Sequence, residues 1–88
     1  YLTNMCMTLA SDYFKAGISI APNVEPLLYD TIWTERYMGL VEENPEGYKN
    51  ASVLTHVDKA KGHLLQIHGN ADDNVHHQHS IKRCFNFV

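Results

Sequence analysis

The sequence predicts an α/β domain with two parallel strands, flanking helices and an incomplete sheet. Two short apolar runs, at residues 17–22 and 63–68, have the length and composition of buried strands. A helical segment separates them, and strands joined in this way usually lie parallel in one sheet. A parallel pair needs helices on both faces and neighbouring strands at its edges. The sequence therefore implies partners that it does not itself contain.

Two helices are expected in the first half of the chain. The first, at residues 1–11, has apolar side chains at helical spacing: Leu2, Met5, Cys6 and Leu9. The second is expected at 29–38. Gly39 should end it, because glycine readily adopts the left-handed conformation found just beyond helix C-termini. Residues 23–29 are expected to be irregular, because Pro26 breaks regular structure.

Two further helices are expected in the second half. Asn44 and Pro45 mark the start of one, because asparagine is a preferred N-cap and proline suits the first turn. Tyr48 would then face inward. Asn74 is expected to cap the last helix, at about 75–82.

Composition excludes several classes of protein. The 88 residues allow one small domain or a piece of a larger one, and a hydrophobic content of 44% is typical of a folded chain. A formal net charge of −3 argues against a nucleic-acid partner, because phosphate binding needs a basic surface. Neither a membrane span nor a signal peptide is expected in these residues.

The segment that follows the second strand has the composition of a functional site. The apolar run stops at His68 and Gly69, and two adjacent carboxylates, Asp72 and Asp73, come soon after. Residues just beyond the carboxyl end of a strand form the ligand crevice of an open α/β sheet. A carboxylate placed there can orient a catalytic histidine or coordinate a cation.

The partners that a catalytic carboxylate needs are missing from the sequence. A nucleophile elbow requires Gly-x-Ser-x-Gly, and no serine in the chain has glycines at that spacing. A general-base histidine should lie well beyond the acid, on a separate loop. Only three histidines follow Asp72, and all lie too close to it: His76, His77 and His79. One member of a catalytic triad is therefore visible, and two are not.

Several blocks of sequence, taken together, resemble one family. They are FKAGISIAP at 14–22, YD at 29–30, TERYMG at 34–39 and HGNADDNVH at 68–76. In this order and without large gaps, they resemble the catalytic domain of dipeptidyl-peptidase-IV-like serine peptidases of the prolyl oligopeptidase family. The resemblance covers residues 1 to about 80. It implies an α/β-hydrolase domain and, in the parent protein, removal of X-Pro or X-Ala dipeptides from peptide N-termini.

The resemblance also implies roles for individual residues. Asp72 matches the triad acid that orients the catalytic histidine, and Asn74 matches the side chain that binds the substrate carbonyl oxygen. Val75 and Tyr29 match walls of the apolar pocket that accepts proline. Trp33 stands where the family usually has a pocket tyrosine. The implied substrate is a peptide with an N-terminal X-Pro sequence, and no cofactor or metal is expected.

Departures from the family pattern indicate a fragment. Tyr1 falls just after the position of the family's Gly-x-Ser-x-Gly, so the nucleophile is absent. Residues 81–85 resemble the family's extreme C-terminus, so the strand and catalytic histidine that belong between Ser80 and Ile81 are expected to be missing. Residues 1–88 are therefore expected to be an incomplete peptidase domain, inactive alone because proteolysis by this route needs the serine and the histidine.

Two other departures affect packing. Pro26 stands where many family members place a pocket tryptophan. Cys84 matches a terminal family cysteine whose disulfide partner would stand at Ala16, so that bridge is lost unless Cys6 replaces it. Whether Cys6 and Cys84 pair is left open by the sequence.

Two alternative functions follow from other features. Family members dimerise through hydrolase-domain surfaces, so the fragment is alternatively a non-catalytic module that binds an intact relative. A less favoured alternative is a metal-binding module in which His76 and His79 share a helix face near Asp72 or Asp73. The family resemblance implies an extracellular or plasma-membrane ectodomain location for the parent protein, which gives weight to the glycosylation sequon at 50–52.

Overall fold

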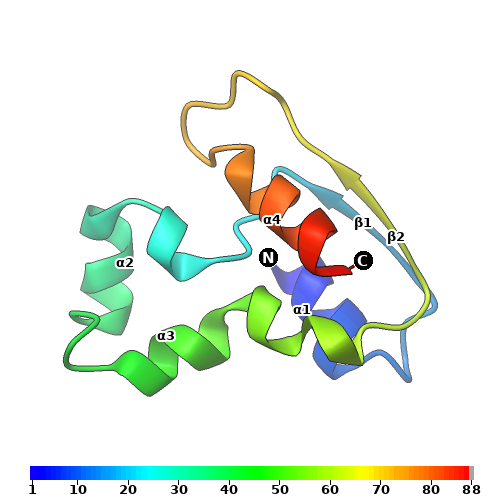
Figure 1. The fold of residues 1–88 in the computed structure, drawn as a ribbon, viewed down its shortest axis with the longest axis horizontal. Helices are drawn as coiled ribbons and strands as arrows, with labels where there is room; N and C mark the ends of the chain where they lie inside the picture. Colours follow the sequence, from blue (N-terminus) through cyan, green and yellow to red (C-terminus); the bar gives the residue numbers. More distant parts are fainter. Residues whose placement is uncertain (88) are drawn as a thin grey trace.

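The computed structural model describes residues 1–87 and confirms the predicted alternation of helices and strands (Figure 1). The regular elements are α1 (Leu2–Leu9), β1 (Ala16–Ile20), α2 (Thr31–Met38), α3 (Pro45–Ala51), β2 (His63–Ile67) and α4 (Gln78–Phe87). Two 3₁₀ helices, η1 (Pro26–Leu28) and η2 (Val53–Lys59), complete the connection between the strands. In Figure 1 the strands form one edge of the molecule, with α2 at the opposite end.

The two strands pair in parallel, as predicted. Ala16 lies opposite His63 at one end of the ladder, and Ile20 lies opposite Ile67 at the other. The backbone N–H of Ala21 donates to the carbonyl of Ile67 at 2.8 Å, so pairing continues one residue beyond β1. The carboxyl ends of both strands are thereby held together, and both lead into the site described below.

Only one face of the sheet is covered, which corrects the expectation that both strands are buried. Ser19 on the covered face is 4% exposed. Four aliphatic side chains on the other face are 47–71% exposed: Ile18, Ile20, Leu65 and Ile67. The covering contacts come from α1, which packs on β1. Nothing in residues 1–87 packs on the other face, so its apolar side chains remain at the surface.

Gly17 lets α1 approach the sheet closely. A Cβ atom at this position would lie 2.9 Å from Thr3 Cγ2 and 3.1 Å from Met7 Cγ. The helix therefore packs with a face that holds Met7 and small polar residues, not with the predicted apolar face. Leu2 and Leu9 are 73% and 53% exposed. The prediction of the helix is confirmed, but its buried face was assigned wrongly.

A small apolar core is supplemented by buried hydrogen bonds. The fully packed apolar side chains are Met7, Val24, Tyr48 and Val53. Between α1, β1 and α4, Asn4 Nδ2 donates to Ser19 Oγ at 2.7 Å, and Arg83 Nε donates to Asn4 Oδ1 at 2.9 Å. All three residues are buried. This polar chain joins the first and last helices to the sheet.

The ends of α2 and α3 follow from local sequence. Asp30 Oδ1 accepts from the backbone N–H of Trp33 at 2.7 Å and caps α2. Gly39 has φ = 75° and ends that helix, as predicted. Asn44 Oδ1 accepts from the N–H of Gly47 at 3.1 Å, which confirms the predicted cap of α3. The expected irregular segment at 23–29 is confirmed apart from the short 3₁₀ turn η1, which occupies its centre.

The last helix starts later than predicted. It runs from Gln78 to Phe87, not over 75–82. Asn74 does not cap it, because the Asn74 side chain accepts a hydrogen bond from Tyr29 and its backbone N–H donates to Asp72. His76 Nδ1 instead accepts from the backbone N–H of Gln78 at 3.2 Å.

Two general features complete the description. Cys6 and Cys84 are free thiols in the structure, with Cys84 exposed. Within residues 1–87, no helix has the length and apolar character needed to cross a bilayer.

Candidate functional site

The loop that follows β2 is organised by the carboxylate of Asp72. Its Oδ1 atom accepts from the backbone N–H groups of Val75 at 2.9 Å and Asn74 at 3.0 Å. These two hydrogen bonds, the one from Val75 first, hold the pKa of Asp72 below its ordinary value. Asp72 is therefore ionised at neutral pH, as an acid that orients a histidine must be.

His68 fixes the base of this loop. Its ring joins three segments: Nε2 lies 2.6 Å from the carbonyl oxygen of Val75, and Nδ1 lies 2.6 Å from Ser80 Oγ. A carbonyl only accepts, so Nε2 carries a hydrogen, and in the neutral ring Nδ1 accepts from the serine hydroxyl. Asp72 Oδ2 is 3.5 Å from the same Nε2. The side chain of His68 is 5% exposed, so these contacts hold a nearly buried ring.

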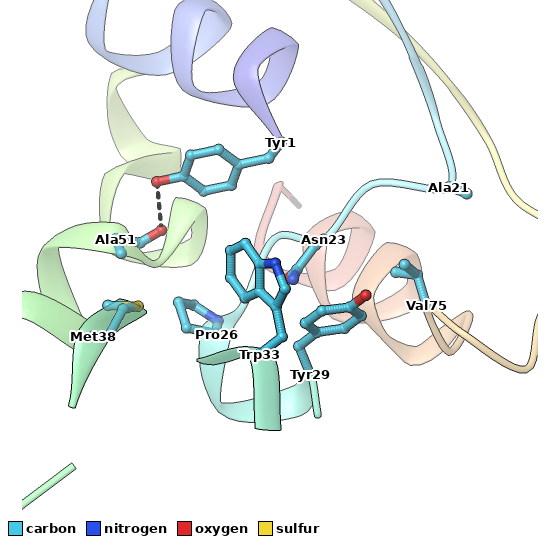
Figure 2. Close-up of a pocket in the computed structure, with 9 residues that line it drawn as sticks. All are labelled: Tyr1, Ala21, Asn23, Pro26, Tyr29, Trp33, Met38, Ala51 and Val75. Atoms are coloured by element: carbon cyan, nitrogen blue, oxygen red, sulfur yellow. Dashed lines mark hydrogen bonds between the residues drawn. The ribbon is translucent and has the colours of Figure 1, made fainter. Parts of the chain in front are cut away.

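A pocket of about 580 Å³ opens beside the loop (Figure 2). It is lined by Tyr1, Ala21, Asn23, Pro26, Tyr29, Trp33, Met38, Ala51 and Val75. The structure thus brings Tyr29, Trp33 and Val75, all named from the sequence, around one cavity. None of the lining side chains carries a charge.

The aromatic wall of the pocket is built by Tyr29, just before α2, and by Trp33 on the first turn of that helix. The rings of Tyr29 and Trp33 meet edge to face, with centroids 5.6 Å apart and an interplanar angle of 76°. Tyr37 lies one turn further, 5.0 Å from Trp33. Trp33 and Tyr37, four residues apart, lie on one side of α2, and Tyr29 stands just before the N-cap Asp30. The Asp30 cap fixes the turn on which Trp33 stands.

Asn74 joins the loop to this wall. Its Oδ1 atom accepts from the hydroxyl of Tyr29 at 2.9 Å. Asn74 itself does not line the cavity, so it stands at the rim. Asp72 lies behind the rim and holds Asn74 and Val75 through their backbone N–H groups. The five residues named from the sequence therefore form one connected group.

Some lining residues were not foreseen. Ala21 and Asn23 follow β1, and Ala21 has φ = 44°, in the left-handed region that favours glycine. Ligands of open α/β sheets bind beyond the carboxyl ends of the strands, and this applies to β1 as well as to β2. The sequence position of Ala21 and Asn23 could therefore have predicted their place in the site. Tyr1 and Ala51 had no such signal; the Tyr1 hydroxyl donates to the Ala51 carbonyl at 3.0 Å and closes one side (Figure 2).

The histidines after Asp72 do not converge. His76 is exposed and its ring lies against that of His77, with centroids 4.5 Å apart. His79 is fully buried, and its Nδ1 accepts from the backbone N–H groups of Val24 at 3.2 Å and Glu25 at 3.3 Å. Residues 1–87 hold no group of three or more His, Cys, Asp or Glu side chains suited to a metal ion. The structure gives no support to the metal-binding alternative.

Comparison with known proteins decides the family. A family model described as the prolyl oligopeptidase family matches residues 1–85. The chain belongs to the prolyl oligopeptidase family. Within it, dipeptidyl peptidase 4 of Bos taurus is 45% identical over 85 residues, which cover 93% of this chain. Venom dipeptidyl peptidase 4 of Vespa velutina is 46% identical over 81 residues, or 85% of this chain.

A solved structure confirms the fold of this prolyl oligopeptidase chain. Dipeptidyl peptidase 4 of Porphyromonas gingivalis superposes with a TM-score of 0.95 and 40% identity over 98% of the chain. The predicted fold class, a partial α/β-hydrolase domain, is therefore confirmed. The chain spans about 11% of the bovine relative, 10% of the wasp relative and 12% of the bacterial structure.

Proposed function

We propose that this chain supplies the triad acid and the proline pocket of a serine-type dipeptidyl peptidase. The observation that carries the proposal is the continuity of the site. Asp72 holds Asn74 and Val75 through hydrogen bonds, Asn74 holds Tyr29, and Tyr29, Trp33 and Val75 line an uncharged pocket. The names of the relatives, which are dipeptidyl peptidases, support the same function.

The roles follow from chemistry. The ring of proline is apolar and compact, so it fits between the aromatic rings of Tyr29 and Trp33 on one side and Val75 on the other. Asn74 at the rim supplies an amide for the carbonyl oxygen of the substrate. Asp72 would bind a histidine ring and stabilise its protonated form. Asp72 Oδ1 is occupied by two backbone N–H groups, so Oδ2 is the atom for that histidine.

The proposal includes inactivity of these 88 residues alone. The sequence holds no Gly-x-Ser-x-Gly, and no histidine other than His68 forms a hydrogen bond or ion pair with Asp72 in the described residues. Loss of one triad member costs on the order of 10⁴ in kcat, and serine and histidine are both lacking. The sequence junction between Ser80 and Ile81 is proposed as the site where the strand and histidine of complete family members are missing.

Binding can be measured without catalysis, because Trp33 is the one tryptophan of the chain and lines the pocket. Titration with the dipeptide Ala-Pro should change the fluorescence of Trp33 and saturate. Val75→Glu, which places a charge in the pocket, should abolish the change. Ile32→Glu is the control, because Ile32 is 86% exposed on α2, the helix that carries Trp33. Absence of saturation in the unaltered chain would count against the pocket assignment.

Activity is tested separately with the chromogenic substrate Ala-Pro-p-nitroanilide. The chain alone should release no p-nitroaniline above the buffer rate. Release at an enzymatic rate by the purified chain would overturn the proposal that these residues lack the serine and the histidine that act with Asp72.

A second candidate function is docking on an intact family member. The uncovered sheet face, Ile18, Ile20, Leu65 and Ile67, favours it, because surface apolar patches of this kind mark interaction sites. Co-expression with a full-length relative followed by affinity purification tests this candidate. Recovery of the relative with the chain, and its loss when Ile18 and Leu65 are both changed to lysine, would support docking. Purification of the chain alone would reject it.

We also propose that the parent protein works outside the cell, as a secreted or membrane-tethered ectodomain. The supporting observation is Asn50, which is exposed near the end of α3 and begins the sequon 50–52. A mass shift of the native protein on digestion with peptide-N-glycosidase, lost in Asn50→Gln, is the expected result. An unmodified Asn50 in protein taken from its source would contradict it.

A further inference from the structure

One polar side chain lines the pocket without a partner. Asn23, just beyond β1, is half-buried among aromatic and aliphatic neighbours. Within residues 1–87 its amide makes no hydrogen bond. The two tyrosine hydroxyls of the pocket are different, because Tyr1 donates to the Ala51 carbonyl and Tyr29 donates to Asn74. The Asn23 amide is therefore available to a ligand as both donor and acceptor.

A second polar group accompanies it. The indole nitrogen of Trp33 donates to no protein atom in the described chain, and Trp33 lines the same pocket as Asn23 (Figure 2). An indole N–H only donates, whereas an amide both donates and accepts. Together they match a hydroxyl group, which accepts one hydrogen bond and donates another. A charged group would find no counter-charge among the lining side chains.

The rest of the pocket favours a ring. The rings of Tyr29 and Trp33, set edge to face at 76°, offer more apolar contact to a compact saturated ring than to a short side chain. The cavity of about 580 Å³ leaves room for one more oxygen atom on a five-membered ring. An unsubstituted proline ring would cover the Asn23 amide and offer it no hydrogen bond in place of those to water. Burial of an unpaired amide weakens the binding free energy.

We propose that Asn23 makes this pocket selective for 4-hydroxyproline over proline as the residue before the cleaved bond. The inference rests on the proposed function, because it takes the pocket as the one that holds this residue. The hydroxyl accepts from Asn23 Nδ2 or Trp33 Nε1 and donates to Asn23 Oδ1, while the ring packs on the aromatic wall. One net hydrogen bond of this kind corresponds to roughly tenfold tighter binding.

Trp33 fluorescence tests the proposal with the unaltered chain. Four dipeptides are titrated: Ala-Pro, Ala-(4R-hydroxy)Pro, Ala-(4R-fluoro)Pro and Ala-Ser. Fluoroproline reproduces the effect of the hydroxyl on ring shape but donates no hydrogen bond. The expected result is that the hydroxyproline peptide binds about tenfold more tightly than the proline and fluoroproline peptides. Ala-Ser should bind more weakly than all three, because it leaves the aromatic wall uncovered.

The variant Asn23→Leu assigns the preference to Asn23. Leucine has a similar size and no polar atom, so it should bring the affinity for the hydroxyproline peptide down to that for Ala-Pro. Asn70→Leu, the same change at an exposed position outside the pocket, should keep the tenfold preference. Circular dichroism of each variant checks that it is folded.

The outcomes separate this inference from the proposed function. Equal binding of the proline and hydroxyproline peptides to the unaltered chain overturns the inference and leaves the proline pocket intact. A preference that survives in Asn23→Leu overturns the role of Asn23. Equal binding of the hydroxyproline and fluoroproline peptides shows that ring shape, not the hydrogen bond, is selected, which also overturns it. No saturable change with any dipeptide overturns the proposed function together with the inference.

Discussion

His79 is fully buried where α4 meets the segment that follows β1, and its Nδ1 accepts two backbone N–H groups. Burial is the main cause that lowers the pKa of His79 below its ordinary value of 6.5. A proton on Nδ1 would face the N–H groups of Val24 and Glu25 and break both hydrogen bonds. Neutral imidazole is therefore the form that the fold requires.

This predicts a loss of stability in mild acid. The unfolded chain binds a proton to His79 at a higher pH than the folded chain does, so the free energy of unfolding falls as the pH drops below about 6.5. The loss is complete below the folded pKa. Urea unfolding measured between pH 7.5 and 5 should show this slope, and His79→Gln should reduce it. His63→Gln, at an exposed position, should leave the slope unchanged; a slope equally steep in His79→Gln would contradict the prediction.

Asp72 offers a second test at the same scale. In Asp72→Asn the amide oxygen still accepts from the backbone, whereas in Asp72→Ala nothing does. Hydrogen exchange at the N–H groups of Asn74 and Val75 should therefore accelerate roughly tenfold in the alanine variant and much less in the asparagine variant. Exchange at Ser19, in the sheet, serves as the internal reference. Equal acceleration in both variants would show that the charge, not the geometry, orders the loop.

At the scale of elements, α1, β1 and α4 are joined by buried polar contacts where apolar packing was expected. Asn4 stands at the centre, since it donates to Ser19 and accepts from Arg83. Asparagine in a helix facing a sheet gives no sequence signal of burial, and neither does an arginine near the end of the chain. Long-range pairing of polar residues, here 79 positions apart, depends on the assembled fold and has no periodicity in the sequence.

Asn4→Ala should therefore destabilise the chain strongly. It leaves the Ser19 hydroxyl without its donor and removes the acceptor of Arg83 Nε, both in buried surroundings. The expected cost is about 2–3 kcal/mol in the free energy of unfolding, measured with urea. Lys49→Ala, on the exposed face of α3, is the control and should change it by less than about 0.5 kcal/mol. A cost below that limit for Asn4→Ala would show that the polar chain does not hold these elements together.

Elements with strong local signals were predicted well. The Asp30–Trp33 cap was not named in advance, but Gly39 and Asn44 fixed the adjoining ends of α2 and α3. The start of α4 was missed because the Asn74 side chain accepts from the hydroxyl of Tyr29, which lies far away in the sequence between η1 and α2, and so does not cap the helix. The residues of the site from β2 onward were found through the family resemblance. Those from β1 and the N-terminus were not, because their approach to the pocket depends on the parallel pairing.

At the scale of the whole molecule, one sheet face is bare. Four aliphatic residues of that face are exposed in an 88-residue chain whose apolar core is small. Small cores give little stability, and we expect a free energy of unfolding below about 5 kcal/mol. The same face should make the isolated chain associate with itself.

Self-association is measured by sedimentation velocity over a range of concentrations. The unaltered chain should form dimers or larger species as the concentration rises, whereas Leu65→Lys should remain monomeric because a charged side chain interrupts the face. Ile32→Lys, at an exposed position of α2, is the control and should associate like the unaltered chain. A chain that is monomeric at all concentrations would show that the uncovered sheet face does not mediate self-association.

The carboxylate of Asp72 binds the N–H of Val75, and Val75 is at once a wall of the pocket. His68 binds the carbonyl of that same residue. One residue, Val75, would thus serve both proposed functions, the choice of substrate and the placing of the acid, which evolution would otherwise tune separately. We expect new specificities in such proteins to arise at positions other than this shared residue, such as Asn23 and Trp33. The loop after β2 should accept little variation, because any change that reshapes the pocket there also displaces the acid.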